Sequence, residues 1–544
     1  PPMPLIPRER VVSVNERTLH DGSVEKAPAA EGVAQALENA KSLGAEGVII
    51  ALINSYRNPE NEHKVKALLQ EIDPDFPAFC SSDVWPIIRE YERTITAAVH
   101  GYVQPRVSFY LESLQSALLE AGVEAPPKVT KSNGGVMSAE SGRTECVQML
   151  LSGTAAGVIG ASFISNLSGF DNTMSLDIGG TSADVGLIID GEFGSTTEYE
   201  VEWGVPVSAL FIDYTTIGAG GGSIAYVDSG GFLRVGPKSA GADPGPACYD
   251  RGGTEPTITD ANIVLGRLDS NYFLGGQMIL KPELAHQAIA KLAEELNLRP
   301  EEAALAILDT VAENMADAIR LMTVERGLDH RTFGLTAFGG AGSLHASDVA
   351  ARLDMEHVVV PPHPGLCSAL GTLLTNQRVD RARTVLHRSD RIDLSLLTDQ
   401  LREISNAARN DLDREGHEGE AEIRGLLNMR YLGQAFGEVI PLTKIDIDQT
   451  VFDQVIEDLH IRHEELYGYS MRDKVVEITE VRVIALGEEA AEALLTAPVG
   501  GDEDKHATRP VYFSGKGFLG AKNPSIRNTS VIIIPYGLEN SMAV

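Results

Sequence analysis

Short apolar runs alternate with helical patterns in the first part of the chain. Apolar positions repeat with helical spacing over residues 31–43 and about 59–72, and the apolar run GVIIALI at 47–53 lies between them. Helical spacing predicts one helix from Trp85 and a second helix over 106–123, ahead of a predicted linker, AGVEAPP. Because helices alternate with buried strands, the pattern predicts α/β layering.

Glycine dominates the middle of the chain. Between residues 132 and 253 the sequence contains SNGG, SGTAAG, DIGGTS, GAGGGS, SGG, GADPGPA and RGG. These clusters predict turns and close backbone approaches between short strands. A helical region follows at about 283–328, then the cluster TAFGGAGS, a helix and the strand HVVVPP. Residues 385–544 return to an ordinary, charge-rich α/β composition.

Composition narrows the class of protein. A chain of 544 residues with 43% apolar and 22% charged residues is expected to be globular and to contain several cores. Its 45 Lys and Arg residues against 77 Asp and Glu residues give a net charge of −32. Such a charge repels nucleic-acid phosphates and anionic lipid heads, so we expect neither nucleic acid nor a membrane as a partner.

The four cysteines, at positions 80, 146, 248 and 367, are far apart and form no CxxC pair. This spacing argues against both a zinc ribbon and a disulfide scaffold. It fits a reducing compartment, and we predict a cytoplasmic protein.

The sequence SLDIGGTSADVGLIID at 175–190 predicts a hairpin of two strands joined by residues 179–182, which we call the glycine tip. Without Cβ atoms, and with positive φ tolerated, consecutive backbone N–H groups at such a tip can point at an anion. Asp177 beside it could hold a divalent cation through water, as Mg²⁺ prefers. The alternative is an ordinary tight turn between core strands, which would carry equal weight if the motif stood alone.

Two further glycine clusters favour a ligand. TAFGGAGSLH at 336–345 places a double glycine between an apolar strand and a helix that begins at about Ser343, so that a helix N-terminus faces the turn. TIGAGGGS at 216–223 follows a strand with Phe211 and Asp213, and its glycines predict that something bulky approaches the backbone. A loop without a ligand is the alternative for this second cluster.

Nine segments in chain order resemble the hydantoinase A/5-oxoprolinase family, over residues 1 to about 380. They are SYRNPENEH (55–63), EYERTITAAVHGYVQP (90–105), SNGGVMS (132–138), SGTAAGV (152–158), LDIGGTSADVGLI (176–188), TIGAGGGSIAYVD (216–228), SAGADPGPACY (239–249), PTITDANIVLGRLD (256–269) and FGGAGSLHA (338–346). MRYLGQAFGEV and YGYSM, after residue 385, resemble the family's C-terminal domain more loosely.

The resemblance implies a fold of the actin/Hsp70/sugar-kinase superfamily: an actin-like (ribonuclease H-like) α/β ATPase core with an additional C-terminal α/β domain. It assigns ATP and Mg²⁺ as cofactors. The cofactor-binding residues that it implies are Gly179, Gly180, Thr181 and Ser182 of the second phosphate loop, Gly339, Gly340 and Gly342 of the adenosine loop, and Gly218, Gly220 and Gly221 of TIGAGGGS.

Three carboxylates are the catalytic candidates that follow from the resemblance: Asp177, which is also the metal ligand, Asp184 and Asp260. A turn cap is the alternative for Asp184, and a helix N-cap is an equal alternative for Asp260. For Cys248 a buried structural role is favoured over a nucleophile.

Other side chains in the same motifs have structural explanations. His345 and His363 lack metal-ligand spacing, so a helix-end or loop role is favoured for both. For Glu92 and Arg93 the alternatives are an exposed helix surface, which is favoured, and a place at the cleft.

The activity implied by the resemblance is ATP-dependent hydrolysis of a cyclic amide, such as a hydantoin, 5-oxoproline or a related lactam. Phosphorylation of the amide oxygen would activate a poor electrophile. The implied partner is a hydantoinase B-type subunit in a hetero-oligomer. The alternatives are an ATP-dependent ketone carboxylase subunit and a non-catalytic, actin-like nucleotide-binding scaffold.

The domain prediction follows the same resemblance. Residues 1–105 are expected to be the remainder of an N-terminal lobe, 106–384 the core domain and 385–544 the C-terminal domain. The family's first phosphate loop is expected upstream of SYRNPENEH, and residues 1–175 contain no such turn. We therefore expect a half-lined cleft at the glycine tip, weak ATP binding by the chain alone, and an exposed apolar surface on the 1–105 layer.

Overall fold

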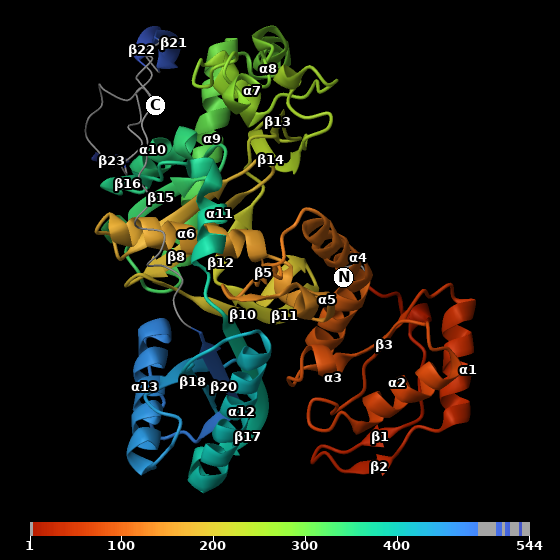
Figure 1. Ribbon diagram of the computed structural model, residues 1–544. Coiled ribbons are helices and arrows are strands. Elements are labelled where there is room, and N and C mark those ends of the chain that lie inside the picture. Colours follow the sequence, from red (N-terminus) through yellow and green to blue (C-terminus); the bar gives the residue numbers. More distant parts are fainter. Residues whose placement is uncertain (1–3, 488–507, 514–516, 523–531, 536–544) are drawn as a thin grey trace. The chain divides into compact units, whose positions relative to one another are not determined.

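The computed structural model describes residues 4–487, 508–513, 517–522 and 532–535. Its helices and strands are mixed along the chain, which confirms the predicted α/β class (Figure 1). The chain divides into two compact units. Unit 1 is Pro1–Ala155, Ser195–Ile212 and Thr375–Ala490, and unit 2 is Ala156–Gly194, Asp213–Leu374 and Ala491–Val544. Each unit thus combines distant stretches of sequence, whereas the three predicted domains are contiguous.

Unit 1 contains most of the short elements. Its helices are α1 (Ala30–Ser42), α2 (Glu60–Ile72), α3 (Ser81–Val84), α4 (Glu90–Glu120), α5 (Ala139–Thr144), α12 (Leu394–Arg414) and α13 (Gln449–Tyr467). Its strands are β1 (Arg17–Thr18), β2 (Val24–Lys26), β3 (Val48–Ile50), β4 (Ala78–Cys80), β5 (Lys128–Thr130), β6 (Val136–Ser138), β10 (Ser195–Glu202), β11 (Val205–Ile212), β17 (Arg378–Arg388), β18 (Glu422–Tyr431), β19 (Glu438–Leu442) and β20 (Val476–Leu486).

The parallel strands β3 and β4 are covered on both faces. On one face, Val33 and Leu37 of α1 and Val65 of α2 form a buried cluster with the strands. On the other face, a Cβ at Gly101 of α4 would lie 2.7 Å from Ile49 Cδ1, so the helix crosses the strands closely. The covered faces do not test the apolar surface predicted over residues 1–105, which was expected where further strands would pair.

Helix α4 is longer than the sequence pattern indicates. It runs without interruption through Pro105, whereas two helices, from Trp85 and from 106, were expected. Arg93 lies in its first turns and is fully buried, which corrects the expectation of an exposed helix surface. Its guanidinium donates to Leu52 O at 2.9 Å and to Ser81 Oγ at 3.1 Å. The EYERT and SYRNPENEH segments thus build a buried polar core, since Glu62 also accepts from Ser81 Oγ at 2.8 Å.

A four-stranded antiparallel sheet in the order β17-β20-β18-β19 forms the C-terminal part of unit 1. Its core combines Leu397 and Leu401 of α12, Phe452 of α13, and Leu427 and Val481 of the sheet. Alternate residues along β18 are buried, as expected for a sheet with a helical layer on one face.

Unit 2 is built on one large sheet. Its helices are α6 (Ser152–Leu167, from Ala156 on), α7 (Ile258–Val264), α8 (Pro282–Leu296), α9 (Pro300–Val324), α10 (Gly342–Arg352) and α11 (Cys367–Leu374). Its strands are β7 (Thr173–Ile178), β8 (Ala183–Ile189), β9 (Glu192–Phe193), β12 (Tyr214–Ile217), β13 (Ser223–Val227), β14 (Leu233–Ser239), β15 (Gly334–Phe338), β16 (His357–Val360), β21 (Thr508–Phe513), β22 (Gly517–Lys522) and β23 (Ile532–Pro535).

The sheet order is β12-β8-β7-β15-β16-β23, with β9 paired to β8. Strands β7, β15 and β16 are parallel, and the hairpin partner β8 is antiparallel to β7. The core of the unit includes Leu176 of β7, Leu335 of β15, and Ile307, Val311 and Met315 of α9, all fully buried. Because β7 and β15 are parallel neighbours, their carboxyl ends lie at the same edge of the sheet.

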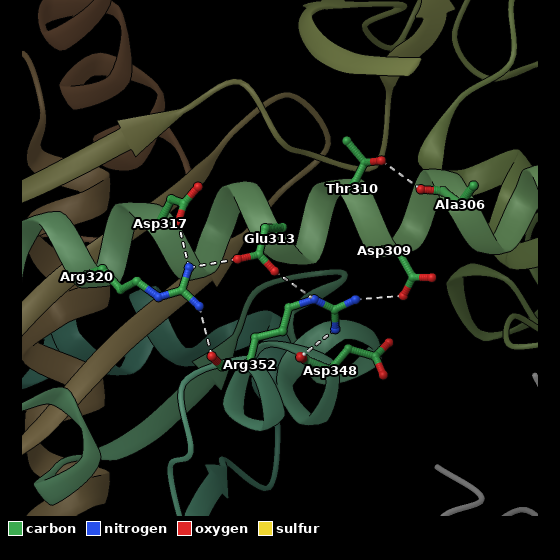
Figure 2. A network of polar contacts seen from close by, with 8 residues as sticks. All are labelled: Ala306, Asp309, Thr310, Glu313, Asp317, Arg320, Asp348 and Arg352. Carbon is green, nitrogen blue, oxygen red and sulfur yellow. Dashed lines mark hydrogen bonds and ion pairs between the residues drawn. The ribbon is translucent and has the colours of Figure 1, made fainter. Parts of the chain in front are cut away.

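Polar contacts tie α9 to α10 (Figure 2). The Arg352 guanidinium of α10 contacts Asp309 Oδ1 at 2.6 Å and Glu313 Oε2 at 3.3 Å on α9. From α9, Arg320 donates back to the Arg352 carbonyl at 2.8 Å. The helix that follows β15 is thereby held against the long helix of the core.

Glycines of helices α6 and α11 have a packing role, and the motif SGTAAGV lies at the start of α6, although it was predicted as a turn. A Cβ at Gly160 would lie 2.3 Å from the Cys367 carbonyl oxygen, and one at Gly371 of α11 would lie 1.8 Å from the Ala156 carbonyl oxygen. The backbones of helices α6 and α11 therefore lie in direct contact.

None of the helices in the described part of the chain has the length and apolar character that a membrane span requires.

Candidate functional site

The glycine tip and the loop after β15 lie side by side. Phe338 at the end of β15 is paired in register with Asp177 near the end of β7. The Ala341 N–H donates to the Ile178 carbonyl at 3.0 Å and joins the two turns directly. This confirms the predicted hairpin and the predicted strand–turn–helix. It places both at the carboxyl edge of parallel strands, where α/β sheets bind ligands.

Backbone donors converge at this edge. Among the described residues, nothing accepts a hydrogen bond from the backbone N–H groups of Gly180, Thr181, Ser182 or Gly340. Helix α10 begins directly after Gly340 and Ala341 and has no side-chain cap, so its first N–H groups face the same edge. Neither Gly180 nor Gly340 has an atom within 4 Å of the position that a Cβ would take. The arrangement of free donors beside open space suits an anion.

Two carboxylates stand opposite each other beside the tip. Asp177 of β7 and Asp184 of β8 are partners in the antiparallel register, so their side chains share one face. Burial, followed by repulsion from Asp184, raises the pKa of Asp177 to about 6, although a hydrogen bond from Ser368 works in the other direction. Asp184 Oδ1 accepts from Thr216 Oγ1 at 2.7 Å.

Two adjacent carboxylates offer the oxygen ligands that a hard divalent cation such as Mg²⁺ prefers. A divalent ion would relieve the repulsion between the two carboxylates and favour the ionised form of Asp177. Asp177 and Asp184 are therefore the residues that would hold Mg²⁺, as ligands or through water.

Residues 218–222, which we call the backing loop, lie against the glycine tip. The N–H groups of Gly220, Gly221 and Gly222 donate to the carbonyls of Thr181, Gly179 and Gly180. A Cβ at Gly220 would lie 2.5 Å from the Thr181 backbone, and one at Gly218 would lie 2.7 Å from Pro237.

The bulky neighbour predicted for this loop is thus the tip itself and the protein around it. Gly220 and Gly221 hold the tip, whereas Gly218 packs against Pro237; the resemblance had implied cofactor binding for all three. The tip carbonyls are thus used by the backing loop, whereas the N–H groups of residues 180–182 have no acceptor among the described residues.

Comparison with known proteins decides the family. A family model described as Hydantoinase/oxoprolinase matches residues 93–381, and its N-terminal-region model matches residues 2–73. The chain belongs to the hydantoinase/oxoprolinase family.

This family member is similar in sequence to named enzymes. It is 35% identical to the caprolactamase subunit alpha of Pseudomonas jessenii over 88% of this chain and 70% of the relative. It is 30% identical to 5-oxoprolinase 1 of Arabidopsis thaliana, over 89% of this chain and 39% of that protein.

Two solved structures resemble this hydantoinase/oxoprolinase family member. The ATP-dependent caprolactamase from Pseudomonas jessenii matches with a TM-score of 0.82 at 30% identity, over 98% of this chain and 81% of that chain. A nucleotide-free acetone carboxylase matches with a TM-score of 0.76 at 25% identity, over 96% of this chain and 76% of that chain.

In this family member, Asp260 has a capping role. It is fully buried at the third position of α7, where it forms a capping box with Thr257. Its two carboxylate oxygens accept from the N–H groups of Ala247 and Cys248 and from the Thr257 N–H and hydroxyl. The structure therefore favours helix capping over the predicted catalytic role, with Asp260 at the third helical position rather than at the N-cap.

Cys248 and His345 are also structural. Cys248 is fully buried, and burial together with Asp260 raises the pKa of its thiol. His345 is fully buried in α10, where burial lowers its pKa to about 4 and its Nε2 lies 3.4 Å from Asn262 Nδ2. Neither His345 nor His363 joins a metal-binding group among the described residues.

Ser368 was missed by the sequence analysis. It lies in α11, in the segment PGLCSALG, and it hydrogen-bonds Asp177. None of the motifs included it, because its contact with Asp177 joins α11 to β7, two segments that are far apart in the sequence.

Gly339 yields a stability prediction. Its φ is +83°, and a Cβ would lie 2.2 Å from Asp177 Oδ1 and 2.6 Å from the Ile178 carbonyl oxygen. We expect Gly339→Ala to destabilise the fold by about 2–4 kcal/mol in denaturant unfolding, because the backbone would be strained and the carboxylate displaced. Gly340→Ala, with an open Cβ position and no positive φ, is the matched control and should cost under about 1 kcal/mol. Equal losses in the two variants would contradict the placement of Asp177 against Gly339.

Proposed function

We propose that this chain is the ATP-using component of an enzyme that opens a cyclic amide, such as a hydantoin, 5-oxoproline or a related lactam. The observation that carries the proposal is the meeting of free backbone donors at the glycine tip with the Asp177 and Asp184 carboxylates at one sheet edge. Relatives named caprolactamase and 5-oxoprolinase support the substrate class. An actin-like core and a hydantoinase B-type partner in a hetero-oligomer belong to the same proposal.

Each group has a defined task in the proposed reaction. The N–H groups of the glycine tip and of the α10 start would hold the ATP phosphates. Asp177 and Asp184 would hold Mg²⁺, which neutralises phosphate charge. The backing loop fixes the tip, so the donors are already oriented before ATP binds. Preorganised donors of this kind lower the cost of charge development in phosphoryl transfer.

The proposed reaction has three steps and consumes two water molecules. The amide oxygen attacks the γ-phosphorus, an O–P bond forms, and ADP leaves with the electrons of the broken P–O bond. Water then adds to the activated carbon, and the C–N bond breaks to release the amine. Hydrolysis of the remaining acyl phosphate yields the carboxylate and inorganic phosphate. The phosphate serves as a leaving group that an unactivated amide lacks.

Ketone carboxylation is a second candidate. The chain is 34% identical to the acetophenone carboxylase gamma subunit of Aromatoleum aromaticum, over 80% of this chain and 61% of that subunit. The same phosphate site would then serve to phosphorylate a ketone enolate or bicarbonate. The two reactions differ in their need for bicarbonate.

Phosphate release by the chain purified with its co-expressed companion subunit tests the proposal. We expect a hydantoin, 5-oxoproline or a lactam to stimulate ATP hydrolysis by about tenfold or more, with Mg²⁺ and without bicarbonate. Stimulation only by acetone or acetophenone with bicarbonate would replace the proposal with ketone carboxylation. ATP binding without stimulation by any of these compounds would favour the non-catalytic scaffold.

A further inference from the structure

A histidine, a cysteine and an aspartate meet in the N-terminal part of unit 1. His63 lies in the first turn of α2, Cys80 is the last residue of β4, and Asp83 lies in α3. One ligand atom from each side chain, namely a ring nitrogen, the sulfur and a carboxylate oxygen, lies within 4.8 Å of the other two. Imidazole nitrogen, thiolate sulfur and carboxylate oxygen are the three kinds of ligand that Zn²⁺ takes from proteins.

The spacing of two of these residues is that of a zinc motif. Cys80 and Asp83 are separated by two residues, as are the cysteines of a CxxC pair. The sequence analysis found no CxxC pair, and here a carboxylate stands where the second cysteine of such a pair would be. His63 comes from another element, α2, so the group of three exists only in the folded chain.

A buried carboxylate next to His63 holds the three elements together. Glu62 has no exposed surface, and its Oε2 accepts from the Ser82 N–H at 2.9 Å and from the Ser82 hydroxyl at 2.7 Å. The start of α2 is thereby fixed to the turn of chain that runs from Cys80 to Asp83. Hydrogen bonds outside the ligand set orient metal ligands in this way before an ion binds.

The three side chains contact one another and are otherwise available. His63 Nε2 lies 2.7 Å from Asp83 Oδ1, and the two side chains are 50% and 45% exposed. Lys66 Nζ lies 3.6 Å from Asp83 Oδ2, which is too far for a hydrogen bond. Within the part of the chain that the structure describes, no hydrogen bond joins the side chain of His63, Cys80 or Asp83 to a residue outside the group.

An ion fits between these side chains after small movements. Bonds of about 2.0–2.3 Å to a tetrahedral ion place neighbouring ligand atoms about 3.3–3.8 Å apart. The His63–Asp83 contact would therefore open by roughly 1 Å, which two half-exposed side chains accommodate by rotation. The ion would replace the proton of the Cys80 thiol, and this proton would leave to solvent.

We propose that His63, Cys80 and Asp83 bind a zinc ion and leave its fourth coordination position to water. The thiolate and the carboxylate together neutralise the two charges of the ion, and a thiolate with an imidazole favours Zn²⁺ over Mg²⁺. The site thus differs in its chemistry from the two carboxylates beside the glycine tip. It joins α2 to the turn between β4 and α3, and it does not depend on the proposed function.

Titration of the metal-free full chain with Co²⁺ tests the proposal. Co²⁺ takes the same tetrahedral ligands as Zn²⁺, and a cobalt–thiolate bond adds a charge-transfer absorption in the near ultraviolet that reports a sulfur ligand. We expect this absorption to saturate at one Co²⁺ per chain and to disappear when Zn²⁺ displaces the cobalt. Stoichiometric Co²⁺ without the absorption would overturn the proposal.

Variants of the ligands and of their neighbour sharpen the test. Cys80→Ser should abolish the charge-transfer absorption. His63→Gln and Asp83→Asn change half-exposed side chains, so the fold should survive, and each should weaken Co²⁺ binding about tenfold or more. Lys66→Met removes a positive charge next to Asp83 and should tighten Co²⁺ binding about twofold or more. Unchanged affinity in both His63→Gln and Asp83→Asn would overturn the proposal.

Matched controls remove a thiol, a histidine and a carboxylate elsewhere. Cys146→Ser removes a buried thiol whose sulfur lies 3.5 Å from His100 Nδ1, and His20→Gln removes an exposed histidine of unit 1. Asp177→Asn changes the carboxylate beside the glycine tip. All three should keep the absorption and the cobalt affinity of the wild type. An absorption that persists in Cys80→Ser, or that a folded Cys146→Ser variant lacks, would contradict the assignment of the ligands.

Discussion

Asp177→Asn is expected to lower Mg²⁺-dependent ATP hydrolysis about 100-fold or more while it makes the folded protein more stable at neutral pH. The loss follows because an amide replaces a charged oxygen ligand next to the glycine tip. The gain in stability follows because the ionised carboxylate of Asp177 is unfavourable in the folded protein. Burial, followed by repulsion from Asp184, raises its pKa to about 6 from 3.8. Steady-state kinetics and denaturant unfolding measure the two effects separately.

The stability gain of Asp177→Asn should increase as the pH rises through about 6. A raised folded-state pKa means that the carboxyl contributes stability below the unfolded-state value, and that this contribution is lost as the pH rises through about 6. Asparagine carries no charge, so the variant should exceed the wild type by up to about 3 kcal/mol above pH 6, and the difference should vanish below about pH 4.

Asp171→Asn is the matched control, because it removes a carboxylate from an exposed position just before β7. It should change neither activity nor stability by a measurable amount. Near-native turnover in Asp177→Asn would remove Asp177 from the metal site. A pH-independent stability difference would contradict the raised pKa of Asp177.

Gly180→Val is expected to weaken ATP binding about 100-fold or more without destabilising the fold. The Cβ position of Gly180 is open and its φ is not positive, so the protein itself accommodates a side chain. A valine side chain would instead fill the open space beside the tip, where we expect the phosphates to bind. Isothermal titration with Mg·ATP, with the companion subunit present, measures the loss, and thermal unfolding checks the fold.

Gly32→Val serves as the control for Gly180→Val. Gly32 lies in α1 of unit 1, and its Cβ position is also open with no positive φ. The Gly32→Val substitution adds the same branched side chain at a position far from the glycine tip in the sequence, so ATP binding should be unchanged. If Gly180→Val binds ATP as tightly as Gly32→Val does, the glycine tip is an ordinary turn.

Local patterns predicted the site better than they predicted its surroundings. The hairpin around the glycine tip and the turn before α10 follow from apolar runs that flank glycines, and both form as expected. The backing loop looked like a ligand loop, because a glycine that faces a backbone and one that faces a phosphate have the same sequence signature. Only the hydrogen bonds from Gly220 and Gly221 to the tip carbonyls distinguish the two.

Long-range packing was the part that the sequence did not reveal. Arg93 looked like an exposed helical residue, yet its partners Leu52 and Ser81 come from elements that precede α4. Asp260 offered two equal roles, and the N–H groups of Ala247 and Cys248 decide between them. The two compact units also depend on contacts between distant stretches, which a contiguous domain assignment does not capture.

Hydrogen–deuterium exchange with and without Mg·ATP, at millimolar nucleotide and with the companion subunit present, tests the central claim most directly. The claim is that ATP phosphates bind at the glycine tip and the start of α10. We predict slower exchange at the N–H groups of Gly180, Thr181, Ser182 and Gly340 with Mg·ATP, and little change with AMP, which lacks the β- and γ-phosphates. Unchanged exchange at these four groups, or equal protection by AMP, would contradict the account.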